Sequence, residues 1–110
     1  MNKAAYFKKF YKVKRGLRKL KSKKPLFTII TVVYNGEKYI QETIDSIAKQ
    51  KVKNYEYIVI DGNSTDNTIN IIKKNLSKID YWLTKNDRGL YDAFNKGMNL
   101  ASGEFICIVN

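Results

Sequence analysis

The chain has 110 residues, enough for one domain, with a single cysteine and no histidine. The lack of histidine excludes Ser-His-Asp catalysis and most zinc sites, and one cysteine excludes a disulfide within the chain and indicates a reducing compartment. The net charge of +11 is unevenly placed, because residues 1–24 hold eleven Lys or Arg and no acid, whereas residues 25–110 hold ten basic and ten acidic residues. Two units are therefore predicted: a basic arm, residues 1–24, and a neutral domain, residues 25–110.

The basic arm carries a helical pattern. Apolar or aromatic side chains recur at spacings of four and three residues: Tyr6, Phe10, Val13, Leu17 and Leu20. A helix with such a face and a Lys/Arg face opposite is typical of segments that lie in a membrane interface. Each Lys or Arg near an anionic leaflet adds about 1 kcal/mol of binding energy. The pattern predicts an amphipathic helix whose partner is an anionic membrane surface; the equally weighted alternative is a solvated basic tail.

The domain begins after Pro25 with strand and helix patterns. Residues 27–33 are apolar and β-branched, which predicts a central strand. Residues 37–49 are expected to form a helix. One face of that helix carries an isoleucine stripe: Ile40, Ile44 and Ile47.

A second strand and helix follow. Residues 55–60 read as a strand that ends at Asp61, and residues 63–66 supply side chains that commonly cap helices. The next helix is expected to run to about residue 76, with three residues directed inward: Ile69, Ile72 and Leu76. Residues 81–84 predict a short third strand.

The last stretch, residues 87–109, reads as loop, helix and strand. Phe94, Met98 and Ala101 recur at helical spacing and are expected to share one helix face, and the continuous apolar run 105–109 predicts a buried parallel strand. Strands that alternate with helices imply a Rossmann-like α/β fold with a mostly parallel sheet and flanking helices. Ligands of such sheets bind at the carboxyl ends of the strands.

Several side chains near those predicted strand ends have binding chemistry. Tyr34 offers a flat face for stacking, Asp61 can accept an N–H from a nucleobase, and Arg88 can neutralise a diphosphate through its planar donor fork. Asp87 can contact the ligand or hold Arg88. Each has a structural alternative: Tyr34 closing the sheet edge, Asp61 capping the following helix, and Asp92 pairing with Lys96 on a helix surface, which is the preferred interpretation of that last pair.

Three motifs in order resemble one known family over residues 26–110. They are the strand end 28–35, the Asp61-Gly62-Asn63-Ser64-Thr65-Asp66 turn, and an Asp-x-Gly-x-Tyr-Asp-Ala-x-Asn-Lys-Gly helix at 87–97. Together they resemble the N-terminal, nucleotide-sugar-binding half of inverting family 2 glycosyltransferases, which have the GT-A fold. The resemblance implies nucleotide-binding roles for five residues: Val32, Tyr34, Asp61, Asp87 and Arg88. Two positions depart from the family pattern, because Gly62 replaces a second acid and Phe94 replaces an arginine.

The resemblance also implies an activity. A sugar would pass from a nucleotide-sugar donor, expected to be a UDP-sugar, to a hydroxyl of a lipid-linked saccharide during surface polysaccharide or glycolipid synthesis. Family members use Mg²⁺ or Mn²⁺ held by an Asp pair, which is expected beyond Asn110 together with the catalytic base. The 110 residues alone are thus expected to be an inactive donor-binding half. The expected location is cytoplasmic, at the inner face of the plasma membrane.

Two other classes of function remain open. A small nucleotide- or nucleic-acid-binding module would use the basic arm on phosphates. The neutral domain makes nucleic acid the less favoured partner. A non-catalytic interaction fragment would pair an open sheet edge with another chain.

Overall fold

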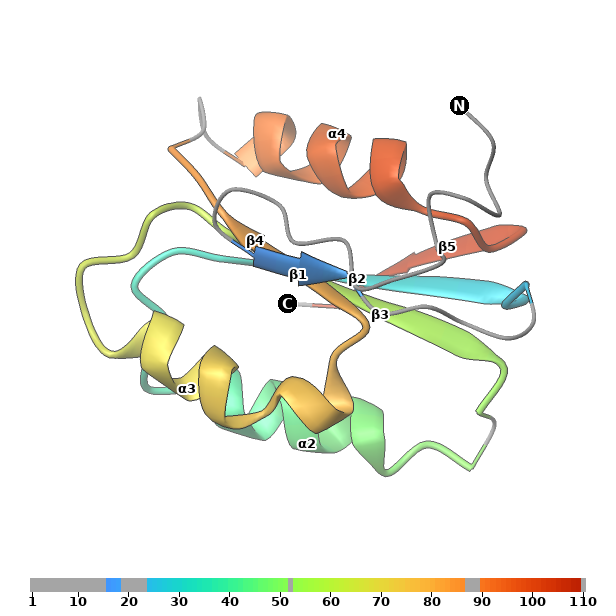
Figure 1. Cartoon of the computed structure of the whole chain (residues 1–110), viewed down its shortest axis with the longest axis horizontal. Helices are drawn as coiled ribbons and strands as arrows, with labels where there is room; N and C mark the ends of the chain where they lie inside the picture. The colour runs from blue at the N-terminus through green and yellow to red at the C-terminus, as the bar shows by residue number, and fades with distance from the viewer. Residues whose placement is uncertain (1–15, 19–23, 52, 87–89, 110) are drawn as a thin grey trace.

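A five-stranded sheet forms the centre of the fold (Figure 1), and the computed structural model describes residues 16–18, 24–51, 53–86 and 90–109. The strands are β1 (Gly16–Arg18), β2 (Phe27–Val33), β3 (Tyr55–Asp61), β4 (Tyr81–Thr84) and β5 (Phe105–Ile108), in the spatial order β1-β4-β3-β2-β5. The four strands β2 to β5 are parallel to one another, and β1 is antiparallel to β4. The predicted α/β class with a mostly parallel sheet is confirmed.

Helices cover both faces of the sheet. Helix α2 (Ile40–Ala48), helix α3 (Thr68–Lys74) and the short 3₁₀ helix η1 (Leu76–Lys78) lie on one face, and helix α4 (Leu90–Leu100) lies on the other (Figure 1). Each connection between successive strands from β2 to β5 therefore contains a helix that packs on a face of the sheet, as is usual for parallel strands. None of the helices in the described part of the chain is long and apolar enough to cross a membrane.

The larger part of the core lies between the sheet and helices α2 and α3. The predicted isoleucine stripe of α2 is confirmed, since Ile40, Ile44 and Ile47 are all buried. On α3, which ends at Lys74 and not at the predicted residue 76, Ile72 is fully buried and Ile69 is partly buried against the same cluster. Leu76 lies in η1 and is also partly buried against it. The one polar group of this core without a hydrogen bond among the described residues is the indole nitrogen of Trp82.

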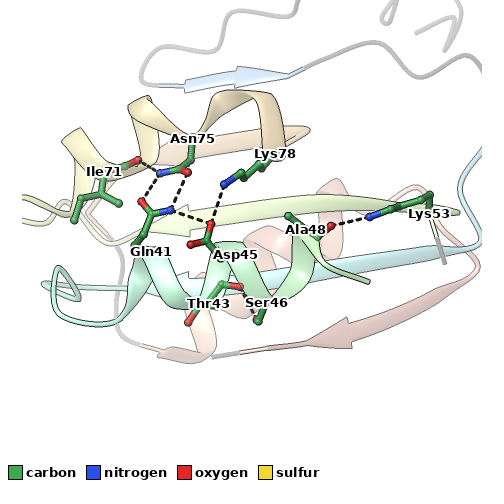
Figure 2. Close-up of polar contacts among 9 residues, drawn as sticks. All are labelled: Gln41, Thr43, Asp45, Ser46, Ala48, Lys53, Ile71, Asn75 and Lys78. Carbon is green, nitrogen blue, oxygen red and sulfur yellow. Dashed lines mark hydrogen bonds and ion pairs between the residues drawn. The ribbon is translucent and has the colours of Figure 1, made fainter. Parts of the chain in front are cut away.

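Polar contacts hold α2 beside α3 (Figure 2). The side-chain amides of Gln41 and Asn75 donate to one another at 3.0 and 2.8 Å, and Lys78 donates to Asp45 at 2.8 Å. Asn75 also donates to the carbonyl of Ile71 at 2.7 Å. These bonds join α2 to the carboxyl end of α3 and to η1.

Helix α4 packs on the sheet through small residues, not through the face predicted from its spacing. Ala93 is fully buried, and a Cβ atom at Gly97 would lie 2.8 Å from Cγ2 of Ile30. Met98, which the spacing assigned to one apolar face with Phe94, is 42% exposed. The helix approaches β2 too closely for a large side chain at position 97. The inner face of the helix is therefore made of small residues, because only they fit at this close distance.

Strand β5 forms where predicted, but the prediction that it is buried is wrong. Its four residues are exposed, with Phe105 at 56% and Ile108 at 47%. In the described part of the chain β5 pairs only with β2, so it is an edge strand. An apolar run indicates a strand, but its position in the sheet depends on pairing that the run itself does not encode.

Part of the basic arm joins the sheet. Residues Gly16–Arg18 form β1, which pairs with Tyr81–Leu83 of β4. The predicted amphipathic helix is therefore wrong at these three residues, where pairing with β4 decides the conformation. The remaining positions of that predicted helix, residues 1–15 and 19–23, lie outside the described residues.

Candidate functional site

Three parallel strands end in register at one edge of the sheet. Val33 of β2 lies beside Asp61 of β3, which lies beside Thr84 of β4. Backbone bonds continue just past the strand ends, from Gly62 N to the Val33 carbonyl at 2.9 Å and from Lys85 N to the Asp61 carbonyl at 3.0 Å. This carboxyl edge, with the β2–α2 loop (34–39) and the β3–α3 loop (62–67), is where α/β sheets bind ligands.

Tyr34 is the most accessible of the predicted site residues that the structure describes. It directly follows β2 and its side chain is 62% exposed. A large aromatic residue with that much free surface offers its ring for stacking. Val32, two residues earlier, is half-buried and packs against the core cluster beneath α4, which contains Ile30 and Ile58.

Asp61 is fully buried and its carboxylate is engaged inside the protein. Oδ1 accepts the Ser64 hydroxyl at 2.5 Å, and Oδ2 accepts the Ser64 amide at 2.9 Å and the Thr84 hydroxyl at 2.6 Å. The first two bonds close the turn after β3, and the third ties that turn to β4. Ser64 lies before helix α3 and Thr84 lies in β4, so Asp61 is not a cap of that helix, and a direct contact with a ligand stays a prediction.

Asn35 joins the two loops of the carboxyl edge. Its side-chain oxygen accepts the backbone amides of Thr65 at 2.8 Å and Asp66 at 3.3 Å. The backbone amide of Asn35 donates to the Ser64 hydroxyl at 2.8 Å. Asn35 has a φ of 49°, in the left-handed region where asparagine is among the most tolerated residues other than glycine.

In two further bonds, backbone amides that follow β2 donate to side chains that follow β3. Gly36 N donates to the Thr68 hydroxyl at 2.9 Å, and Glu37 N donates to Asp66 Oδ2 at 3.2 Å. Asp66 Oδ1 also accepts the Thr68 amide and hydroxyl at 2.9 and 2.5 Å. The N-cap position of α3 is Asn67, outside the predicted residues 63–66, and its side chain makes no capping bond, whereas Asp66, one residue earlier, accepts the first amide of the helix.

These bonds shift the pKa of Asp66. Burial raises the pKa of its carboxyl, but the hydrogen bonds from Thr68 and from the Glu37 amide outweigh that effect, and the pKa lies below its ordinary value of 3.8. Asp66 is therefore ionised near neutral pH and accepts bonds through both oxygens.

Asp87 and Arg88 lie outside the described residues. The residue just before them, Asn86, accepts two hydrogen bonds: its side-chain oxygen accepts the Asn63 amide at 3.1 Å, and its carbonyl accepts the Lys96 ammonium at 3.3 Å. Lys96 also pairs with Asp92 at 3.2 Å, which confirms the preferred interpretation of those two residues as a helix surface pair. This pair therefore supplies no free charge to the carboxyl edge.

Sequence reasoning missed most of the polar network at this edge. Thr84 and Thr68 are buried and hydrogen-bonded there and were not predicted, and Ser64 was predicted only as a capping side chain and as part of the Asp61 turn. The available signal was the position of hydroxyl residues at a strand end and just after one.

The described residues do not supply a metal site. Among residues 16–18, 24–51, 53–86 and 90–109 there is no group of three or more His, Cys, Asp or Glu side chains placed to hold an ion. Of the two buried carboxylates among these residues, Asp61 accepts bonds from Ser64 and Thr84, and Glu56 accepts bonds from Thr28 and Ser102.

Comparison with known proteins agrees with the arrangement of strands and loops. The model of the family described as "Glycosyl transferase family 2" matches residues 28–110. The chain is 36% identical over 85 residues to a "PGL/p-HBAD biosynthesis glycosyltransferase" of Mycobacterium bovis (strain BCG / Pasteur 1173P2), an alignment that covers 74% of this chain and 33% of that protein.

Two solved structures share the fold. S. aureus TarS 1-349 in complex with UDP superposes with a TM-score of 0.65 at 32% identity, over 76% of this chain and 26% of that one. Mannosyltransferase PcManGT from Pyrobaculum calidifontis, in complex with GDP-Man and Mn²⁺, gives a TM-score of 0.69 at 26% identity, over 77% and 27%. The chain thus spans about a third of the curated relative and about a quarter of the solved ones. With the family model matching nearly the whole α/β domain, the chain belongs to glycosyl transferase family 2.

Proposed function

We propose that these 110 residues bind the nucleotide part of a sugar donor at the carboxyl edge of the sheet. The observation that carries the proposal is Tyr34, which is 62% exposed directly after β2, at the edge where parallel strands bind ligands. The tyrosine ring stacks on the nucleobase, and its hydroxyl is available to the polar rim of the ligand. The solved relatives support this, since one was crystallised with UDP and another with GDP-Man.

The preferred donor in this proposal is a UDP-sugar. A pyrimidine ring covers one tyrosine face, and the relative with the higher identity of the two structures compared above is the UDP complex. Val32 packs beneath the end of β2 and supports the position of Tyr34. Arg88 neutralises the diphosphate with its planar donor fork, and Asp87 either contacts the ligand or positions Arg88. Asp61 contributes at the same edge, as an acceptor for the base or through the turn that it holds.

The complete reaction in this proposal is an inverting transfer of the sugar to an acceptor hydroxyl. The acceptor is a lipid-linked saccharide of a surface polysaccharide or glycolipid. The chain spans only 33% of the curated relative, so residues outside these 110 supply the acceptor side, the catalytic base and the ligands of a divalent ion. When bound, such an ion neutralises the charge that develops on the leaving diphosphate. On this proposal the isolated chain binds the donor without transferring the sugar.

Titration with nucleotides tests the donor proposal. Amide chemical shifts of the 110-residue chain are followed by NMR while UDP, GDP or ADP is added. We expect UDP to bind most tightly, with a dissociation constant of about 1 mM, because a free energy of about 4 kcal/mol suits a site without its metal. Tyr34→Ala should weaken UDP binding about tenfold, and Tyr34→Phe should keep most of it, since stacking survives without the hydroxyl.

Phe105→Ala is the matched control. Phe105 is also an exposed aromatic residue, but it lies in β5 beside Phe27, where the strands begin and not where they end. Its loss should leave UDP binding unchanged. Equal affinity of wild type and Tyr34→Ala for UDP would contradict the proposed site, and tighter binding of GDP would overturn the choice of donor.

A further inference from the structure

Asn35 makes more bonds across the carboxyl edge than its neighbours Gly36 and Glu37, whose backbone amides each make one. The structure records four bonds between Asn35 and residues 64–66. The side-chain oxygen of Asn35 accepts two backbone amides and, more weakly at 3.4 Å, the Thr65 hydroxyl, and the backbone amide of Asn35 donates to the Ser64 hydroxyl. The side-chain nitrogen of Asn35 has no hydrogen bond with any residue that the structure describes. The oxygen is thus the structurally used end of this amide.

The contact is anchored below in the sheet. Ser64, which accepts the Asn35 amide, donates to the buried carboxylate of Asp61, and that carboxylate also accepts the hydroxyl of Thr84. A continuous set of bonds therefore runs from the β2–α2 loop through β3 to β4. Bonds to a buried carboxylate are charge-assisted and stronger than those between neutral groups.

Asn35 also turns the chain immediately after the exposed Tyr34. Its φ of 49° lies where most residues are strained, and asparagine, aspartate and glycine adopt it at the least cost. The direction of the backbone after Tyr34 thus depends on this residue, and the direction is held because the side chain is bonded to the facing loop.

We propose that Asn35 is a positioning residue of the donor site: its side-chain oxygen locks the β3–α3 loop onto the β2–α2 loop and so presents Tyr34 in place before any nucleotide binds. The ligand-binding part of this inference rests on the proposed donor function. The lock itself is a property of the free chain. A ligand that finds its aromatic partner already in place loses less affinity to ordering of the site.

A direct contact between Asn35 and the ligand makes the opposite demand on the side chain. It would use the free nitrogen, whereas the lock uses the oxygen. Asn35→Asp keeps an acceptor oxygen and the tolerance for positive φ but removes the nitrogen. Asn35→Gly keeps the backbone conformation and removes the whole side chain. The two variants therefore separate the lock from a contact.

The first measurement needs no ligand. Amide hydrogen exchange is followed by NMR on the free 110-residue chain, at the amides of Thr65 and Asp66. We expect these two amides to exchange faster in Asn35→Gly than in wild type, and to regain protection in Asn35→Asp. Unchanged exchange in Asn35→Gly overturns the lock.

The second measurement is titration with uridine and UDP. Uridine is included because it is uncharged, so the new carboxylate of Asn35→Asp does not repel it. We expect Asn35→Gly to bind both ligands about fivefold to thirtyfold more weakly, the equivalent of one or two hydrogen bonds, and Asn35→Asp to bind uridine as wild type does. Equal loss of uridine binding in both variants overturns positioning in favour of a direct contact, and wild-type affinity in Asn35→Gly overturns any role.

Asn54→Ala serves as the control. The side-chain oxygen of Asn54 also accepts a backbone amide, that of Leu26 at 3.1 Å, but at the other edge of the sheet. Its loss should lower stability without changing exchange at Thr65 or affinity for UDP. If wild type binds no nucleotide at all, the proposed donor function fails, while the exchange of Thr65 and Asp66 still decides whether Asn35 locks the loops.

Discussion

At the scale of single residues, β3 is marked by a buried carboxylate near each end. At the amino end, Oε2 of Glu56 accepts the Thr28 hydroxyl at 2.6 Å and the Ser102 amide and hydroxyl at 2.5 and 2.7 Å. At the carboxyl end, Asp61 accepts bonds from Ser64 and Thr84. A charge is buried at tolerable cost only when several donors replace its water. Both acids therefore join the middle strand of the sheet to its neighbours.

The lowered pKa of Asp66 leads to a prediction about how the stability of the chain changes at acidic pH. A carboxyl whose pKa is lower in the folded than in the unfolded state adds stability above its unfolded value of 3.8, and this contribution is lost as the pH falls through the folded pKa. We expect Asp66→Asn to be less stable than wild type at pH 7, with the difference shrinking once the pH falls below about 3.8. Urea unfolding followed by fluorescence of the buried single tryptophan, Trp82, measures this.

Asp45→Asn distinguishes the cause of the effect. The pKa of Asp45 is also lowered, with the hydrogen bond from Lys78 as the largest cause. That exposed ion pair should lose its contribution in about 1 M salt, where charges are screened within about 3 Å. The bonds of Asp66 come from amides and a hydroxyl, so its contribution should resist salt. An Asp66→Asn difference that stays the same from pH 7 to pH 3 would show that ionisation is not involved.

At the scale of elements, α4 shows how closely a helix can approach a sheet. Ala93 and Gly97 are spaced four residues apart, so they lie on one helix face, and that face packs on β2 and β3. The predicted pairing of Phe94 with Met98 described a second, more exposed face. Large apolar residues at helical spacing are thus an incomplete guide where the inner face is made of small ones.

Substitution of Gly97 by alanine decides between two opposing effects. Alanine favours a helix by about 1 kcal/mol relative to glycine. Its Cβ, however, would lie 2.8 Å from Cγ2 of Ile30, and overpacking a core costs about 1–3 kcal/mol. Cγ2 is attached to the branched Cβ of Ile30 and has little freedom to move. We expect Gly97→Ala to lower the free energy of unfolding, as measured by urea titration.

Asn99→Ala is the matched control, because position 99 is an exposed site on the same helix. It should stabilise the chain by a few tenths of a kcal/mol through helix propensity alone. Adding Ile30→Val to Gly97→Ala should recover part of the loss, since it removes the second close atom, Cδ1 at 3.0 Å. A Gly97→Ala variant as stable as Asn99→Ala would mean that α4 shifts freely on the sheet.

At the scale of the whole molecule, the boundary in charge along the chain is not a boundary of the fold. Eleven basic residues precede Pro25, and the rest of the chain is neutral. Yet β1, within that basic stretch, forms the edge of the sheet beside β4. At the other edge β5 exposes Phe105, Ile106 and Ile108. Exposed apolar edge strands commonly pair with further polypeptide, so the interaction alternative retains a physical basis.

The basic stretch is expected to carry any affinity of the chain for membranes. Deleting residues 1–15 removes six Lys or Arg and leaves β1 in place. We expect the full chain to co-sediment with anionic vesicles and to be released by salt, since each basic residue near the surface adds about 1 kcal/mol. The deletion should bind much less, and neither protein should bind vesicles of neutral lipid.

Two outcomes would change this view. Binding of anionic vesicles by the deletion variant would assign the affinity to the domain instead. Far tighter binding of duplex DNA than of vesicles by the full chain would favour the nucleic-acid alternative. A tryptophan unfolding curve for the deletion that matches wild type is the check that the sheet has kept its structure.

The sequence alone determined the alternation of elements and the positions of Tyr34 and Asp61 at the carboxyl ends of their strands. The strands 27–33 and 81–84 have the predicted bounds, and the stripe of α2 is buried as expected. These features are local, because hydrophobic period and β-branching act within a few residues. The positions of Tyr34 and of the Asp61 turn at strand ends follow from the apolar runs that precede them, whereas their roles in binding stay predictions.

Only the tertiary structure decided which groups meet across the chain. Asp61 and Thr84 are 23 residues apart, and Asn35 and Thr65 are 30 apart, so neither bond leaves a mark in any one window of sequence. The same holds for β1, whose three residues follow β4 and not their own helical pattern, and for β5, whose apolar run lies at an edge. Burial and hydrogen bonding are set by strand order and by the closeness of packing. Both properties arise only when distant segments come together.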